Sequence, residues 1–404
     1  MERKRRIGTV HEETTVKVDY IIRNGRVLDP SAGVDEVRDI YIRNMHIADP
    51  QGASVECRPD AVIDAAGMLV TPGLIDFHTH IFHEGSSICI HPDMMIAQGT
   101  TAAVDAGSAG TSTYEAFARD VAARSLVRVK GFLTVYGGGQ LDPKLCEDFN
   151  PALYNIDKME RVIDANRDNV LGLKIRLSKG VVPEQTGTDY LRAVVELADE
   201  LNRRLGTALR VCVHTTNAPV SAGELAACLR PGDIFCHCFQ GAGNPIVAED
   251  GTVDPLVLAA RKRGVLFDAA NGRGNFGVET ARRALAAGFL PDVISTDLTV
   301  DKFNMPPYAK SLPLVISKYL ALGMDLMTII KAVTETPADL MGMRDKIGTL
   351  KAGAYADIAI FDLKEKHYVQ KDFCDTELVC EQLLVPQLTM LAGEIQYCQA
   401  GFYL

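Results

Sequence analysis

The sequence predicts an α/β fold, a TIM-like (β/α)₈ barrel joined to a small β-sandwich domain that is formed from both chain ends. In the central part of the chain, apolar strand-like runs alternate with amphipathic helical stretches, which is the pattern of β-α units around a parallel sheet. Both ends of the chain instead contain short strand-like runs separated by glycine turns. Histidine and aspartate residues also stand at the ends of the central runs, which meet at one mouth of a barrel.

Eight apolar runs are predicted to be the barrel strands, since each is short and followed by turn signals or by a helical period. The clearest helix is predicted over residues 188–205, where charged residues lie opposite one apolar face made of Leu191, Val194, Val195, Leu197 and Ala198. In chain order, the eight predicted strands are Gly73–His80, Thr100–Asp105, Val129–Tyr136, Val170–Leu177, Arg210–Thr215, Asp233–Cys238, Val265–Ala270 and Val293–Asp297.

The predicted β-sandwich domain combines residues 1–70 with residues 345–404, and residues 71–344 are expected to form the barrel. In the first segment, Asn24-Gly25 is a hairpin signal between strand-like runs, and no long helical period is present. In the last segment, strand-like runs recur near residues 357–362 and 387–391, with glycines as turn residues. We therefore expect the two ends of the chain to build one β domain together.

The composition excludes several classes of partner. The 404 residues carry a net charge of -10, with 47% hydrophobic and 23% charged residues, so the chain has no field that attracts nucleic acid or an anionic membrane. The basic start, residues 1–6, is not followed by the apolar stretch of a secretory signal. No run approaches the length of a membrane span. We expect a cytoplasmic protein that acts on a small molecule.

The strongest local signal is the segment Asp76–His80, which reads Asp-Phe-His-Thr-His and follows an apolar run. Side chains alternate along a strand, so His78 and His80 point the same way and can bind one divalent ion. Two histidines on a polar strand face are the alternative. Four later strand-like runs add one ligand-type residue each, namely Lys174, His214, His237 and Asp297. A carboxylate that ends a buried strand needs a cation partner, so these positions together predict a metal site.

The ten cysteines predict neither disulfides nor thiolate ligands. They form no Cys-x-x-Cys framework, and several lie inside apolar runs, as small buried residues do in a reducing cytosol. Cys236 and Cys238 flank His237, and period-two alternation predicts that both point away from the face that His237 uses. Cys212 shares a face with His214, so it could lie behind the metal ligands.

Three phrases together resemble the amidohydrolase superfamily, whose members pair a barrel with a small β domain built from both chain ends. They are Pro72 to His80 (PGLIDFHTH), Ser295 to Asp297 (STD) and Gly348 to Ile358 (GTLKAGAYADI). Within that superfamily, residues 91–93, 99–101, 104–110 and 288–292 resemble the dihydroorotase-like, metal-dependent deacetylase branch. The resemblance covers essentially the whole chain.

The resemblance implies a binuclear site with two divalent metal ions, usually zinc. His78, His80 and Asp297 would hold the first ion, and His214 and His237 the second. Lys174 would bridge them as a carboxylated lysine, because burial lowers the pKa of a lysine and the neutral amine can add carbon dioxide to form a carbamate. The alternative is a one-metal site in which Lys174 pairs with a carboxylate. Relatives commonly form dimers or larger assemblies, so a homo-oligomer is expected.

The reaction implied by the resemblance is hydrolysis of an amide, a cyclic amide or an ester. Two cations would make hydroxide available near neutral pH and polarise a carbonyl group. Asp297 would be the catalytic base and then the acid that protonates the leaving group. The leading hypothesis is a deacylase for a small, anionic N-acyl or O-acyl compound. Its rivals are a ring-opening cyclic amidase, like dihydroorotase or hydantoinase, and a non-catalytic scaffold with the same barrel.

Residues that bind the substrate lie on loops and are harder to predict. Arg176 is expected either to hold a substrate carboxylate or to form an internal salt bridge. The deacetylase branch usually carries a histidine in an Asp-x-Gly-His-Gly pattern after the seventh strand, where this chain has Asn271, with Arg273 two residues later. The remaining candidates follow the third and eighth strands, namely Tyr136, Lys302, Asn304 and Tyr308.

Overall fold

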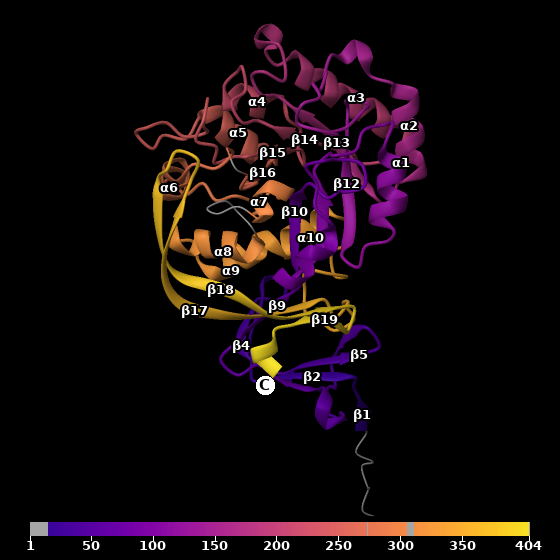
Figure 1. The fold of residues 1–404 in the computed structure, drawn as a ribbon, viewed down its shortest axis with the longest axis vertical. Helices are drawn as coiled ribbons and strands as arrows, with labels where there is room; N and C mark the ends of the chain where they lie inside the picture. The colour runs from indigo at the N-terminus through magenta and orange to yellow at the C-terminus, as the bar shows by residue number, and fades with distance from the viewer. Residues whose placement is uncertain (1–14, 273, 305–310, 404) are drawn as a thin grey trace, which may run out of the picture.

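The computed structural model describes residues 15–403, apart from residue 273 and residues 305–310. The predictions for Arg273 and Tyr308 therefore fall outside the described residues, and the side chain of Asn304 is not described either. Figure 1 shows the helices and parallel strands in the upper part of the molecule and the sheets made from both chain ends below them. The predicted fold class is confirmed.

Seven parallel strands form the wall of the barrel, and each pairs with the next strand along the chain. Their order in the sheet is therefore their order in the sequence, as β-α units require. The strands are β10 (Leu74–Thr79), β11 (Thr100–Asp105), β12 (Arg128–Thr134), β13 (Val170–Arg176), β14 (Arg210–His214), β15 (Ile234–Cys236) and β16 (Leu266–Asp268).

The eighth predicted strand, residues 293–297, is present as an irregular segment that closes the barrel. Val293 forms a parallel bridge to Asp268 of β16, and Leu298 forms one to Thr79 of β10. The amide of Asp297 donates to the carbonyl of His78 at 2.7 Å. Asp297 has a φ of 51°, and such a left-handed residue interrupts an extended strand. The prediction of a regular strand was therefore wrong, although its position was right.

Helices cover the outside of the barrel (Figure 1). The helix predicted over residues 188–205 is confirmed as α3 (Asp189–Leu205), and it ends at Gly206, which has a φ of 64°. Its buried residues are the predicted Leu191, Val194, Leu197 and Ala198, together with Leu201, while the predicted Val195 is half-buried. The other barrel helices are α1 (Tyr114–Ala116), α2 (Ile156–Ala165), α4 (Ala222–Cys228), α5 (Pro255–Arg263), α6 (Val278–Ala286), α7 (Val300–Asn304), α8 (Leu312–Ala321), α9 (Leu326–Val333) and α10 (Glu335–Leu340).

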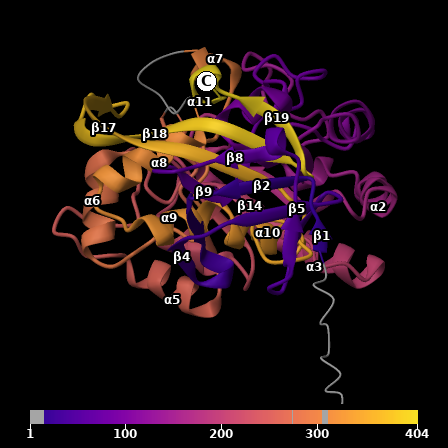
Figure 2. The ribbon, with the colours of Figure 1, turned by 90° about the horizontal axis from the view of Figure 1, so that it is seen from below.

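Both chain ends contribute to the sheets beside the barrel (Figure 2). One sheet has the order β19-β18-β17-β9-β3-β4 and a second has the order β6-β5-β2-β8, while β1 pairs with β7. Ile22 and Ile42 from the second sheet share a buried cluster with Val70 and Ile358 from the first, as in a sandwich. The domain boundaries near residues 70 and 345 stay a prediction.

The strands of these sheets are short, except for the long hairpin of β17 and β18, whose second strand packs on α8. Their bounds are β1 (Thr15–Lys17), β2 (Tyr20–Arg23), β3 (Arg26–Asp29), β4 (Val34–Val37), β5 (Ile40–Arg43), β6 (His46–Ala48), β7 (Ser54–Glu56), β8 (Val62–Asp64), β9 (Leu69–Pro72), β17 (Ile358–Lys371), β18 (Glu377–Leu391) and β19 (Glu394–Cys398). A short helix, α11 (Ala400–Tyr403), follows β19.

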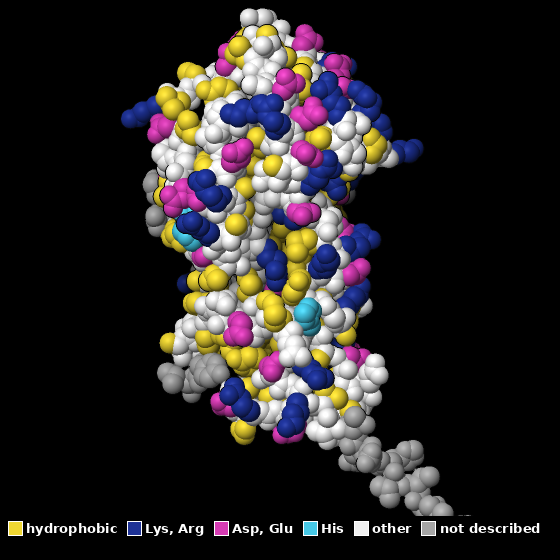
Figure 3. All heavy atoms as spheres, turned by 90° about the vertical axis from the view of Figure 1, so that its right-hand side faces the viewer, with side chains coloured by type: hydrophobic (Ala, Val, Ile, Leu, Met, Phe, Trp, Pro, Cys, Tyr) yellow, Lys and Arg dark blue, Asp and Glu magenta, His cyan; other side chains and the backbone are white. Residues whose placement is uncertain are grey.

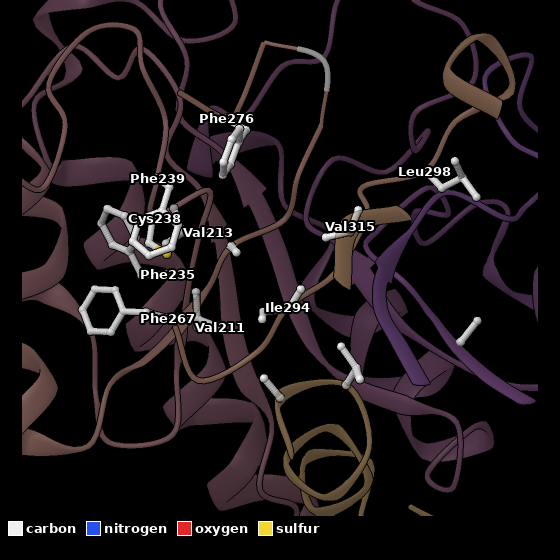
Figure 4. Close-up of a cluster of buried hydrophobic side chains, with 14 of the residues drawn as sticks. Val211, Val213, Phe235, Cys238, Phe239, Phe267, Phe276, Ile294, Leu298 and Val315 are labelled. Carbon is white, nitrogen blue, oxygen red and sulfur yellow. The ribbon is translucent and has the colours of Figure 1, made fainter. Parts of the chain in front are cut away.

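Apolar side chains fix the strands whose ends carry the predicted ligands. Val211 and Val213 of β14, Phe235 of β15 and Phe267 of β16 lie in one buried cluster (Figure 4). The rings of Phe235 and Phe267 are 5.4 Å apart between centroids. Close packing of this kind restricts movement of the backbone, so the ends of β14 and β15 have fixed positions.

The surface carries charges of both signs, as expected from a sequence with 42 Lys and Arg and 52 Asp and Glu residues. On the face shown in Figure 3, acidic and basic side chains are interspersed. Among the helices of the described ranges, none combines the length and the apolar character needed to cross a bilayer.

The closing segment is tied to β10 by a buried carboxyl group, which gives a test of the barrel closure. Asp76 accepts hydrogen bonds from the amide of Thr296 at 3.0 Å and from its hydroxyl at 2.6 Å. Thr296→Val removes the second bond and leaves a buried oxygen without that donor, so we expect the free energy of unfolding to fall by about 1–3 kcal/mol. Urea titration measures this. Thr252→Val, at an exposed position, is the control, and its free energy of unfolding should change by no more than about 0.5 kcal/mol. Equal losses of stability in the two variants would contradict the role of Thr296 in closing the barrel.

Candidate metal centre

The first predicted ligand group converges at the carboxyl end of β10. His78 and His80 leave this strand on the same side, as the alternation predicted, and both meet Asp297 of the closing segment. The Nε2 atom of His80 is 3.2 Å from Oδ1 of Asp297, and Nε2 of His78 is 3.7 Å from the same oxygen. All three side chains are buried. Two imidazole nitrogens and a carboxylate oxygen so arranged can hold a divalent ion.

The second predicted group lies next to the first. His214 ends β14, and His237 follows β15 directly. Nε2 of His237 and Nδ1 of His214 are 2.8 Å apart, and the ring of His237 lies 5.1 Å from that of His78 between centroids. The two histidines thus present facing nitrogens beside the first group. The structure brings together all the histidines that the sequence predicted as ligands.

Fixed partners orient three of these rings. In each case one nitrogen is bound by the protein and the other faces the centre, which is how metal-binding histidines are normally held. Nδ1 of His78 lies 3.0 Å from Oδ2 of Asp268, Nδ1 of His80 lies 2.9 Å from Oγ of Ser108, and Nδ1 of His237 lies 2.8 Å from the carbonyl oxygen of Ala270. The sequence prediction did not identify Asp268 or Ser108 in this role.

Burial holds three histidines of the centre in the neutral form. Burial lowers the pKa of His78 and of His214 well below the ordinary range, and it lowers the pKa of His237 to about 3. A neutral imidazole keeps a lone pair for a metal, whereas a protonated ring does not. The electrostatics of the centre therefore favour a metal ligand set over a cluster of charged histidines.

Lys174 lies among the ligands, but its pKa is not lowered as the sequence analysis expected. It is fully buried on β13, and its Nζ is 3.5 Å from Nε2 of His78 and 3.5 Å from Sγ of Cys212. Burial acts to lower its pKa, but the thiols of Cys212 and Cys236 and the carboxylate of Asp297 outweigh burial and leave the pKa above its ordinary value. The carbamate on Lys174 stays a prediction.

Cys236 is closer to the centre than alternation predicted. Its Sγ is 3.2 Å from Sγ of Cys212 and 4.0 Å from Nζ of Lys174, so it shares the interior with His237. The reason is the backbone of His237, whose φ of 60° breaks the two-residue period at the end of β15. The prediction that Cys236 points away from the ligand face was wrong, while Cys212 lies behind the ligands as expected.

Strained backbone conformations gather at this centre. His237, Ala270 and Asp297 have φ values of 60°, 37° and 51°, which residues with a side chain adopt rarely. Gly272 is needed for a different reason, which is space: a Cβ atom there would overlap Oδ2 of Asp297. Conformations of this kind persist where the surrounding structure enforces them, and they concentrate at functional sites.

Asp297 is held by two donors on the side opposite the histidines. Oδ2 accepts hydrogen bonds from Nζ of Lys302 at 3.0 Å and from Nδ2 of Asn275 at 2.8 Å. Burial acts to raise the pKa of Asp297, but Lys302 and the facing histidines outweigh it and hold the pKa well below the ordinary range. Lys302 was predicted to bind substrate, and the structure instead engages it with Asp297.

A pocket of about 390 Å³ opens in front of the ligands, and Arg176 is the substrate-binding candidate that lines it. Nη1 of Arg176 forms an ion pair with Glu147, from the loop after β12. The internal salt bridge that the sequence left open is therefore present, yet Arg176 still faces the pocket. Glu147, Gln140 and Asn275 line the same pocket and were missed, since nothing in their local sequence distinguishes them from ordinary loop residues.

Two other candidates lie outside the pocket lining found among the described residues. Asn271 is buried, donates to the carbonyl oxygen of Ser295 at 2.9 Å and accepts hydrogen bonds from Lys318 and Tyr319. Tyr136 packs its half-buried ring against Phe149, with centroids 6.3 Å apart. Both side chains serve the internal structure here, and Asn275 rather than Asn271 contacts Asp297 from the loop after β16.

Comparisons with known proteins agree with this geometry. A sequence model described as the amidohydrolase family matches residues 69–381. A deacetylase of Agrobacterium fabrum is 30% identical over 340 residues, covering 82% of this chain and 80% of the relative. A crystal structure of an adenine deaminase superposes with a TM-score of 0.83 at 26% identity, and the match covers 95% of this chain and 100% of that chain. A crystal structure of a dihydroorotase superposes with a TM-score of 0.79 at 26% identity, and the match covers 93% of this chain and 97% of that chain.

The space around Lys174 depends on Gly107, which gives a test of the centre. A Cβ atom at Gly107 would lie 2.6 Å from Cβ and Cγ of Lys174, so Gly107→Ala must displace that side chain. We expect the variant to purify with less bound metal than the wild type, as measured by elemental analysis. Gly353→Ala is the matched control, because Gly353 has a similar φ of 89° with open space around it. Equal metal content in all three proteins would contradict the placement of Lys174 at the centre.

The hydrogen bond between Asp268 and His78 gives a second test. Asp268→Asn removes the negative charge that orients the ring, so we expect the metal affinity to fall by about 10- to 100-fold. Competition with a chelator measures the affinity, and thermal unfolding of the metal-free variant checks its fold. An affinity equal to that of the wild type would show that Asp268 does not position a ligand.

Proposed function

Because the chain belongs to the amidohydrolase family, we propose that it is a metal-dependent deacylase that hydrolyses the amide or ester bond of a small N-acyl or O-acyl compound. Family membership makes it a hydrolase acting on carbon–nitrogen bonds, and the acyl substrate is the proposal. The observation that carries the proposal is the buried Asp297, which faces His78 and His80 at the base of the pocket, with His214 and His237 beside them.

We propose that the centre takes two divalent ions, zinc first among the candidates. His78, His80 and Asp297 would hold one ion, and His214 and His237 the other, with Lys174 as a carbamate between them. Nitrogen and carboxylate donors in this mixture suit zinc and several other divalent ions. When bound, such ions lower the pKa of water and polarise a carbonyl oxygen.

Asp297 is the residue that moves the proton. Lys302 and Asn275 bind Oδ2 and leave Oδ1 toward the histidines. Its low pKa keeps it ionised, so it can accept a proton from the attacking water. The same carboxyl group can then donate that proton to the leaving nitrogen or oxygen. Lys302 and Asn275 orient this exchange without themselves changing charge.

The pocket supports a substrate that carries a negative charge. Arg176 lines it, and a guanidinium group binds carboxylates with a two-pronged geometry. We also propose a homo-oligomer and a cytoplasmic location, as the sequence predicted. The alternative function is a cyclic amidase, favoured by the likeness to the dihydroorotase structure.

Hydrolysis assays on the metal-loaded protein test this function. The panel contains N-acetyl amino acids, O-acetyl hydroxy acids, dihydroorotate, hydantoins and adenine, and we expect turnover of acyl compounds. Asp297→Asn should lower kcat by about 10²- to 10⁴-fold, because proton transfer is lost. Asp164→Asn, at an exposed surface ion pair, is the matched control. Turnover of ring compounds alone would overturn the deacylase in favour of the cyclic amidase, and no turnover with full metal content would overturn both.

A further inference from the structure

Glu147 brings a buried carboxylate into the pocket with one oxygen unused. Its side chain is only 8% exposed, and it lines the pocket together with Arg176. Oε1 accepts the hydrogen bond from Arg176. Oε2 is buried and accepts no hydrogen bond within residues 15–403 as far as they are described. Burial raises the pKa of Glu147, and the Gln140 side chain of the same pocket is near enough to oppose that rise without bonding Oε2 at regular geometry. A buried acceptor without a donor is costly and rare in a folded protein, so this oxygen indicates a donor supplied by a ligand.

Arg176 has binding capacity left as well. A guanidinium group carries five N–H donors, and Glu147 accepts a hydrogen bond from one of them, on Nη1. The side chain of Arg176 is 28% exposed, so it is reachable from the pocket. One arginine can bind two carboxylates at different edges of its plane. The Arg176–Glu147 pair therefore offers a free donor edge beside a free acceptor.

The pair stands next to the metal centre. Arg176 is the neighbour of His214 across β13 and β14, and it lies two residues beyond Lys174 on the same strand face. Glu147 and His80 line the same pocket. A ligand group bound by the pair thus lies in the same pocket as the ligand residues of the centre.

We propose that Arg176 and Glu147 form a two-point subsite for an N-acyl α-amino acid, in which Arg176 binds the carboxylate and Oε2 of Glu147 accepts the neighbouring amide N–H. This inference rests on the proposed deacylase function and narrows its substrate to amides. An O-acyl hydroxy acid presents an ester oxygen at the same place. That oxygen is an acceptor, which gives Glu147 no hydrogen and repels its charge.

A neutral N–H suits this oxygen better than an ammonium group. Arg176 already supplies a full positive charge to Glu147. Lys302 adds positive charge at the nearby centre, and like charges in a buried site repel strongly. An amide N–H satisfies the acceptor without adding another charge. We therefore assign the subsite to the scissile amide rather than to a free amino group.

The experiment compares three acetyl compounds with the same side chain: an N-acetyl amino acid, its N-methylated form and the O-acetyl hydroxy acid. The N-methyl and ester compounds keep the carboxylate but lack the N–H. The variants are Glu147→Leu, which removes the acceptor, and Glu147→Gln, which keeps the shape and a neutral oxygen. Glu160→Gln is the matched control, since Glu160 pairs with Arg204 at 3.1 Å on α2. Metal content and thermal unfolding are measured for each protein.

We expect Glu147→Leu to lower kcat/KM for the N-acetyl amino acid by about 10- to 100-fold, with a smaller loss for Glu147→Gln, as removal of a hydrogen bond to a charged group predicts. The values for the N-methyl and O-acetyl compounds should change by less than about threefold, because neither compound donates a hydrogen to Glu147. A disturbed Arg176 would instead lower all three values together. Glu160→Gln should leave all three values unchanged.

Equal losses on all three compounds would overturn the subsite, because they would show a structural role for Glu147. A wild-type preference for an amino acid acylated on its side chain, with a free ammonium group, would also overturn it. If no compound is hydrolysed, the deacylase itself fails, and calorimetry on the same proteins decides the subsite. The subsite then requires that the wild type binds the N-acetyl amino acid about tenfold or more tightly than the O-acetyl acid, and that Glu147→Leu removes this difference; equal binding would overturn it.

Discussion

The structure depends on one electrostatic constraint, which is the buried carboxylate of Asp297 at the mouth of the barrel. A charge so little exposed to water needs opposite charge and hydrogen bonds on both of its oxygens. Lys302 and Asn275 satisfy one oxygen, and the imidazoles of His78 and His80 face the other. The left-handed backbone, the glycine at position 272 and the irregular closing segment are the means by which the chain brings these groups together.

Much of the fold and of the ligand set follows from local periodicity. The two-residue period of β10 places His78 and His80 on one side, and the helical period of α3 selects its buried face. Both signals act over a few residues, so a single sequence reveals them. The meeting of distant strand ends follows from parallel topology, because every strand of a barrel delivers its carboxyl end to the same mouth.

The rest depends on contacts that no local pattern encodes. Cys236 faces the interior because His237 has a left-handed backbone, which alternation cannot foresee. Asn271 is a plausible substrate ligand by type, but Lys318 and Tyr319 from α8 take its oxygen. Glu147 enters the pocket from an irregular loop, and its partner Arg176 lies on a strand. Only the tertiary structure decides which polar groups remain free for a ligand.

The ligand set can be tested directly by X-ray absorption at the metal edge of the protein reconstituted with zinc. Two buried thiols lie beside Lys174, so sulfur is the competing donor at this centre. Our account predicts a first shell of nitrogen and oxygen only, at about 2.0–2.2 Å, from the histidines and Asp297. A shell of sulfur near about 2.3 Å would assign the metal to Cys212 or Cys236 and contradict the account.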